Sequence, residues 1–131
     1  MSDNARIIVV DDEPSVLESF KMILSIKNYN VDLFEDSTEA LKTFAKGKYD
    51  VAFVDIKMPK VDGLELLRQF KEKDPEIEVA MVTAYGDEHS HARAIDLGAL
   101  EYLRKPFLME EIYELVSRGI RRRMARRDQA F

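Results

Sequence analysis

The chain has 131 residues, 46% of them hydrophobic and 34% charged, a composition typical of one globular domain and not of a disordered chain. It contains no cysteine, which excludes disulfides, thiolate nucleophiles and thiolate metal sites and fits a reducing compartment. No apolar run approaches the roughly 20 residues of a membrane span, and residues 1–4 lack the features of a secretion signal, so we expect a cytoplasmic protein.

The net charge of −5 is unevenly distributed along the chain. The last 14 residues hold six of the 20 lysines and arginines but one of the 25 acidic side chains, which leaves a balance of −10 in residues 1–117. An acidic body argues against nucleic acid binding on the main surface. We expect residues 1–122 to form the domain and residues 123–131 to be a basic tail or the start of a linker.

The strand expected at residues 51–55 lies at the centre of the predicted fold. Four apolar residues run directly into Asp55, and the lack of polar alternation is typical of a strand covered on both faces. Pro59 then opposes continuation as strand or helix. Other apolar segments predict strands at residues 6–10, 31–34, 77–82 and 99–103.

Amphipathic segments between these strands predict helices that begin near Pro14, at Asp36 or Ser37, at Asp62, near Asp87 and at Leu108. The core-facing residues are expected to be Val16, Phe20 and Ile23; Ala40, Leu41 and Phe44; Leu64, Leu67 and Phe70; and Leu108, Ile112, Leu115, Val116 and Ile120. Gly47 and Gly98 are expected to end the second and fourth helices. Five successive β–α units predict a parallel sheet with helices on both faces, joined by right-handed crossovers.

Polar side chains stand at the carboxyl ends of four predicted strands: Asp11 and Asp12, Asp55, Thr83 and Lys105. In a parallel sheet these ends share one edge, which is where ligands bind in open α/β folds. Three carboxylates without fixed partners repel one another and need a cation. An all-oxygen ligand set without histidine or cysteine suits Mg²⁺.

A magnesium ion, a hydroxyl and a lysine around one carboxylate are the components of phosphoryl transfer, with Asp55 as the nucleophile that forms an aspartyl phosphate. Each residue alone also has a structural explanation. Asp11 and Asp12 could cap a helix, Thr83 could simply end a strand, and Lys105 could be a surface charge. Their joint placement at strand ends favours a site.

The chain resembles the receiver domain of two-component response regulators over residues 5–122. The motifs that carry the resemblance are Val9-Val10-Asp11-Asp12-Glu13-Pro14, Val54-Asp55-Ile56-Lys57-Met58-Pro59-Lys60-Val61-Asp62-Gly63, Val82-Thr83-Ala84 and Tyr102-Leu103-Arg104-Lys105-Pro106-Phe107. The resemblance implies a flavodoxin-like, doubly wound (βα)5 α/β fold, with a five-stranded parallel sheet in the order 2-1-3-4-5.

The resemblance also implies that Asp55 accepts a phosphoryl group from a sensor histidine kinase or a phosphotransfer protein. Asp12 would bind Mg²⁺ directly and Asp11 mainly through water, with Asp55 and the backbone carbonyl of Lys57 completing the metal site. Lys57 and Tyr85 occupy the positions that in the family modulate the attacking water. Such a domain is not an enzyme in the ordinary sense, having at most self-phosphorylation from small donors and slow self-dephosphorylation.

Thr83 and Tyr102 would be the switch pair of the family, and Lys105 would contact the phosphoryl group and would be joined to Pro106 by a cis peptide bond. The moving surface would be the fourth helix, fifth strand and fifth helix. Its partner would be a downstream output domain, another protein or, on phosphorylation, a second copy of the chain. His89 and His91 on the polar fourth helix are expected to be solvated.

Two other functions are compatible with parts of the pattern. A Mg²⁺-dependent phosphatase with an aspartyl-phosphate intermediate uses the same residue types, but usually has a second acid two positions after the nucleophile, where this chain has Lys57. Nucleic acid could instead contact the basic end, which contains Arg118, Arg121, Arg122, Arg123, Arg126 and Arg127.

Overall fold

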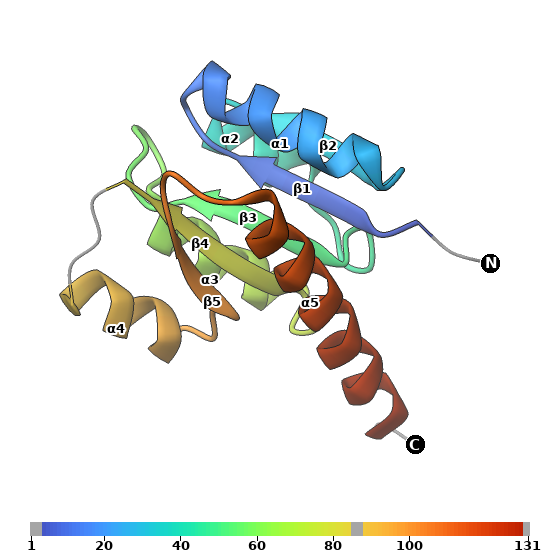
Figure 1. Ribbon diagram of the computed structural model, residues 1–131. Coiled ribbons are helices and arrows are strands. Elements are labelled where there is room, and N and C mark those ends of the chain that lie inside the picture. The colour runs from blue at the N-terminus through green and yellow to red at the C-terminus, as the bar shows by residue number, and fades with distance from the viewer. Residues whose placement is uncertain (1–3, 85–87, 130–131) are drawn as a thin grey trace.

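A five-stranded parallel sheet runs through the computed structural model, which describes residues 4–84 and 88–129, without the side chains of residues 127–129 (Figure 1). The strands are β1 (Arg6–Val10), β2 (Asn30–Phe34), β3 (Val51–Asp55), β4 (Glu78–Thr83) and β5 (Glu101–Arg104). The helices are α1 (Pro14–Ile26), α2 (Ser37–Thr43), α3 (Gly63–Lys73), α4 (Glu88–Asp96) and α5 (Met109–Gln129). The strand order β2-β1-β3-β4-β5 confirms the predicted doubly wound α/β fold.

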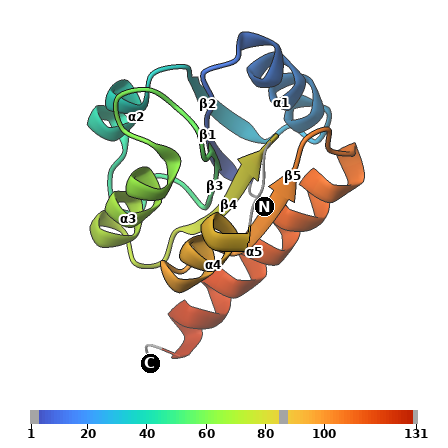
Figure 2. The ribbon, with the colours of Figure 1, turned by 90° about the vertical axis from the view of Figure 1, so that its left-hand side faces the viewer.

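Helices cover both faces of the sheet: α1 and α5 lie on one face and α2, α3 and α4 on the other (Figure 2). Every residue of β3 and β4 is buried, whereas the edge strands β2 and β5 are mostly half-buried or exposed. The difference follows from position, since a strand between two neighbours and beneath two helix layers leaves no side chain in water. Asp55 and Thr83 are therefore buried polar ends of central strands.

Each face of the sheet has its own apolar core. On one face Phe44 stacks on Phe70 with ring centroids 4.1 Å apart, and on the other Phe20 packs 5.0 Å from Phe53 and 4.9 Å from Phe107. Such tilted and stacked aromatic pairs contribute about 0.5–1.5 kcal/mol each beyond the area that they bury.

The predicted helix stripes agree with the structure at most positions and differ at a few. The fully inward residues of α1 are Leu17, Phe20 and Leu24, while Val16 and Ile23 are partly buried. In α3, Leu66 is fully buried and Leu64 lies at the margin. Leu108 was expected to face the core and is 64% exposed, because it precedes α5.

Short polar side chains determine where the helices begin. Asp36, not Ser37, caps α2, since its side chain accepts a 2.8 Å hydrogen bond from the backbone N–H of Thr38. Asp62 caps α3 through the backbone N–H of Glu65 at 2.9 Å. After the carboxyl-terminal end of α4, Gly98 has a φ of 95°, a left-handed conformation that favours glycine after a helix.

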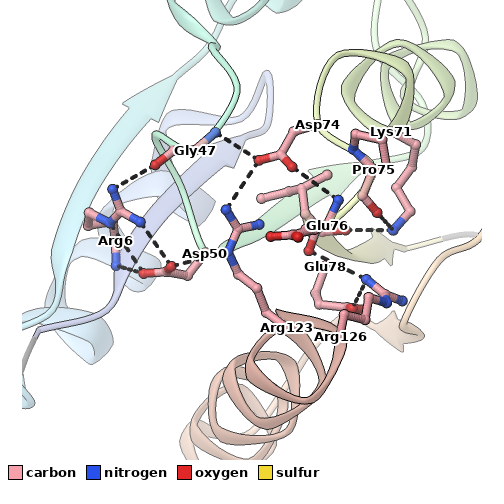
Figure 3. Close-up of polar contacts among 11 residues, drawn as sticks. Arg6, Gly47, Asp50, Lys71, Asp74, Pro75, Glu76, Glu78, Arg123 and Arg126 are labelled. Carbon is pink, nitrogen blue, oxygen red and sulfur yellow. Dashed lines mark hydrogen bonds and ion pairs between the residues drawn. The ribbon is translucent and has the colours of Figure 1, made fainter. Parts of the chain in front are cut away.

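Helix α5 continues past residue 122 without a break, and Arg123 and Arg126 of this helix form ion pairs with the body of the domain (Figure 3). Nη2 of Arg123 lies 3.3 Å from Oδ2 of Asp74, and its Nε lies 3.6 Å from Oδ1 of Asp50. Arg126 pairs with the fully buried Glu78. Arg123 and Arg126, which lie in the segment expected to be a basic tail or linker start, thus form ion pairs with the body of the domain.

We call this group the distal charge cluster: Arg6, Asp50, Asp74, Glu78, Arg123 and Arg126. Three of its members mark the amino-terminal edge of the sheet, because Arg6 and Glu78 begin β1 and β4 and Asp50 precedes β3. The cluster thus lies at the opposite end of the strands from Asp11, Asp55 and Lys105.

Replacing Arg123 by Ala should lower the free energy of unfolding by about 3 kcal/mol, because Asp74 and Asp50 would lose their buried counterion. Urea denaturation measures the change. Arg121→Ala is the matched control: this side chain is 67% exposed, so its loss should change stability by less than about 0.5 kcal/mol. Equal effects of the two substitutions would contradict the anchoring role of Arg123.

Candidate functional site

Three aspartates come together at the carboxyl-terminal edge of the sheet. Asp11 and Asp12 follow β1, Asp55 ends β3, and one carboxylate oxygen of each lies within 4.8 Å of the other two. Asp11 and Asp55 are 1% and 5% exposed, whereas Asp12 faces solvent. The topology causes this convergence, because β1 and β3 are adjacent and parallel.

The backbone around these carboxylates is held by hydrogen bonds and by close packing. The N–H of Asp11 donates to the carbonyl of Phe34 on the neighbouring strand at 3.0 Å, and Oδ1 of Asp11 accepts from the N–H of Glu13 at 2.9 Å. Behind Asp55, a Cβ at Gly63 would overlap the carbonyl oxygen of Asp55. Glycine at this position therefore lets the loop after β3 fold back beneath the site.

Lys105 contributes a positively charged side chain to the site. Its Nζ lies 2.9 Å from Oδ2 of Asp11, 2.9 Å from Oε1 of Glu13 and 3.7 Å from Oδ2 of Asp55. Its backbone N–H donates to the carbonyl of Thr83 at 2.8 Å, and the bond to Pro106 is cis, as the family resemblance implied. The pairing with Glu13 was not expected, because nothing in the sequence around an acidic residue at the start of a helix indicates a partner 92 residues away.

Burial and neighbouring charge shift the acid–base equilibria of the site. Burial, followed by the charge of Asp11, raises the pKa of Asp55 to about 6, against the opposing effects of Lys105 and the backbone amide of Lys57. Burial also raises the pKa of Asp11. Burial alone would lower the pKa of Lys105, but its hydrogen bond with Glu13 and its close ion pair with Asp11 outweigh that effect and raise it.

The donor set fits a magnesium ion. Asp11, Asp12 and Asp55 offer only oxygen ligands, and Oδ2 of Asp11 is buried without a hydrogen bond of suitable geometry although Lys105 is close. One lysine does not balance three aspartates and Glu13, so a divalent cation would relieve the remaining repulsion.

Tyr102 lies against α4. Its hydroxyl is 2.9 Å from the hydroxyl of Ser90, and its ring stacks on His91 with centroids 4.6 Å apart and planes 16° from parallel. His91 is exposed, as expected, but its packing against Tyr102 was not predicted, since nothing in the sequence indicates which face of α4 meets β5. Thr83 is 1% exposed at the end of β4, and Tyr85 is outside the described residues.

Comparison with known proteins decides the family. The model of the response regulator receiver domain matches residues 7–117. The chain belongs to the response regulator receiver domain family. Receiver domains are signalling domains that bind Mg²⁺ at an acidic pocket.

Similar proteins include both whole regulators and single receiver domains. The chain is 35% identical over 127 residues to the response regulator MprA of Mycobacterium ulcerans (strain Agy99), and this match covers 97% of the chain and 55% of that relative. It thus spans about half of the length of the curated relatives that it matches. Within the described residues, no helix combines the length and apolar character that crossing a membrane requires.

Solved structures give the same fold. A receiver domain protein from Clostridium thermocellum is 35% identical with a TM-score of 0.87, covering 92% of this chain and 98% of that one. A CheY-like receiver domain protein from Methanospirillum hungatei JF-1 is 27% identical with a TM-score of 0.89, covering 95% and 99%.

Asp55→Asn should raise the free energy of unfolding of this receiver domain by about 2 kcal/mol at pH 7.5 without Mg²⁺. Because the folded-state pKa of Asp55 is about 6 and the ordinary value is 3.8, the folded protein binds more protons between these values. Its stability therefore falls as pH rises through that window, a loss that the amide avoids.

Denaturant titrations of wild type and variant at several pH values, with a chelator present, measure this effect. The gain from Asp55→Asn should shrink as pH falls from 6 towards 4, while the exposed control Glu18→Gln should show no comparable trend. A gain that is the same at pH 4 and pH 7.5 would assign it to packing and not to the buried charge.

Proposed function

We propose that this receiver domain accepts a phosphoryl group on Asp55 from the phosphohistidine of a sensor histidine kinase or a phosphotransfer protein, in a Mg²⁺-dependent reaction in the cytoplasm. The observation that carries the proposal is the convergence of Asp11, Asp12 and Asp55 with Lys105 at one edge of the sheet. A carboxylate nucleophile, an oxygen-only cation site and a lysine are the groups that phosphoryl transfer to aspartate needs.

The chemistry follows from the positions of these side chains. With a pKa of about 6, Asp55 is ionised at neutral pH, so an Oδ can attack the phosphorus. The O–P bond forms as the N–P bond to the donor histidine breaks, and the electron pair of that bond returns to the imidazole nitrogen. Asp11, Asp12, Asp55 and the carbonyl of Lys57 would hold Mg²⁺, which supplies charge neutralisation at the phosphoryl oxygens.

Lys105 and Thr83 would stabilise the product. Nζ of Lys105, already 3.7 Å from Oδ2 of Asp55, would pair with a phosphoryl oxygen, and the Thr83 hydroxyl would donate a hydrogen bond to another. The new charge would favour a conformer in which Thr83 moves towards Asp55 and the ring of Tyr102 leaves α4 and turns inward. Phosphorylation then acts by shifting a population between two states of the α4-β5-α5 face.

Two alternatives are less well supported. A phosphatase would need an acid–base residue near Asp55, but the position two residues later is Lys57. Nucleic acid binding by the basic end would need free arginines, and Arg123 and Arg126 are paired with Asp74 and Glu78.

Incubation with acetyl phosphate and Mg²⁺ should produce an acid-stable, hydroxylamine-labile mass gain of one phosphoryl group. The gain should disappear with a chelator and in Asp55→Asn, because both remove a component of the reaction. Intact-protein mass spectrometry measures it, with Asp50→Asn as a control at an acid of the distal charge cluster. Undiminished labelling of Asp55→Asn would refute the assignment.

Thr83→Ala should retain most of the labelling, but labelling should no longer move Tyr102. The variant lacks the hydroxyl that would move towards the phosphoryl group. NMR spectra recorded with and without beryllofluoride should show shift changes in α4, β5 and α5 for wild type and much smaller ones for the variant. Thr43→Ala, at the end of α2, serves as the control and should behave as wild type. Shift changes in Thr83→Ala as large as those in the wild type would exclude the hydroxyl as the link.

A further inference from the structure

A groove of about 710 Å³ is lined by residues of α4, β5 and α5, at the β5 edge of the sheet. The buried side chains of Leu103 and Leu115 line it, and Glu88, Glu110 and Glu111 are exposed at its sides. We call it the acidic groove. Its volume is in the range of ligand and peptide sites, and its apolar lining with charged margins is typical of a protein contact.

The groove carries an excess of negative charge that the protein itself does not neutralise. Arg118 is engaged by Glu101 at 2.6 Å and by Glu114 at 3.8 Å, so it compensates charges within the groove. Among the residues that the structure describes, neither Glu88 nor Glu110 forms an ion pair.

Arg104 is the other cation of the lining, against five glutamates in total. The groove therefore has a net charge of −3 when its histidine is neutral. Unpaired acids beside an apolar floor select against an acidic occupant and favour a cationic one, since complementary charge gives an interface its specificity.

A second copy of this chain is a poor occupant. Two acidic grooves placed face to face would repel each other. In the basic end of a second copy, Arg123 and Arg126 are also unavailable, because they pair with Asp74 and Glu78 of their own chain (Figure 3). Arg122 lies 3.8 Å from the same buried Glu78 and Arg121 lies 3.9 Å from Glu114.

We propose that the acidic groove receives a cationic segment of another protein, with an apolar side chain on Leu103 and Leu115 and Lys or Arg side chains beside Glu88 and Glu110. The inference rests on the proposed function and deepens it by naming the chemistry of the partner. The stacked rings of Tyr102 and His91 belong to the lining of the same groove, so an inward movement of Tyr102 changes its shape.

Two labelled 16-residue peptides test the proposal by fluorescence anisotropy. Both are amphipathic with leucines on one face, and they differ only in carrying lysine or glutamate on the other. The lysine peptide should bind wild-type protein more tightly than the glutamate peptide, with an affinity that falls as salt rises because exposed charges are screened. Equal binding of the two peptides would overturn the proposal.

Paired charge variants separate the groove from general attraction to an acidic protein. The double substitution Glu88→Gln and Glu110→Gln should lower the affinity for the lysine peptide by roughly three- to tenfold, as expected for the loss of two exposed charge contacts. The control, Glu18→Gln with Glu35→Gln, changes net charge equally at another acidic hollow and should leave the affinity nearly unchanged. Equal weakening by both pairs would overturn the groove assignment.

Separate labelling of wild-type Asp55 with acetyl phosphate distinguishes the two proposals. Groove-dependent peptide binding without labelling would refute the phosphoryl-acceptor function and leave the groove assignment standing. Labelling without a difference between the two variant pairs would refute the groove assignment alone. With beryllofluoride, the lysine peptide's affinity should change at least about threefold if Tyr102 connects the two sites.

Discussion

The burial of two like charges at the carboxyl edge of the sheet is the constraint on which the rest of this receiver domain depends. Asp11 follows β1 and Asp55 ends the neighbouring β3, and both are almost completely removed from water. Desolvation and mutual repulsion raise the pKa of Asp55 to about 6. Lys105 opposes that repulsion from β5, and its position depends on the backbone bond to Thr83. The fold therefore keeps a carboxylate in an unfavourable charged state that a bound cation would relieve.

The opposite edge of the sheet is arranged in the reverse manner. In the distal charge cluster, buried acids face buried or half-buried arginines, and α5 is fastened across the amino ends of β3 and β4 by Arg123 and Arg126. The distal charge cluster therefore pairs its buried acids with arginines from α5, whereas one lysine contacts both Asp11 and Asp55 at the carboxyl edge.

Helix α4 is the element best suited to respond. Within Glu88–Asp96 only Ala94 is buried, so few apolar contacts oppose a displacement of the helix. Ser90 and His91 nevertheless hold Tyr102 from the same helix, through a hydroxyl contact and a stacked ring. The proposed switch and the acidic groove therefore share one side chain. A change at Asp55 could reach a partner without any movement of the central strands.

The sequence by itself determined the five β–α units, the parallel sheet and the polar residues at its strand ends. These follow from apolar runs, helix periodicity and motif spacing, which are local properties of the chain. It also indicated Mg²⁺ chemistry around Asp11, Asp12 and Asp55, because parallel strands bring their ends to one edge. Local pattern missed Leu17 and Leu24 in α1 by one position each and chose Leu64 over the deeper Leu66 in α3, since an apolar stripe does not state which of its members lies deepest.

Only the tertiary structure decided the long-range charge partners. The sequence placed Arg123 in a basic tail, yet its side chain is buried. Helix α5 packs against Asp74 and Asp50, which are 49 and 73 positions away in the chain. Glu13 acquired Lys105 as a partner, and His91 acquired Tyr102, for the same reason. The sign of a charge is written in the sequence, but its desolvation and its nearest counterion depend on packing between distant elements. Those two quantities decide whether an arginine anchors a helix and whether a carboxylate can act as a nucleophile.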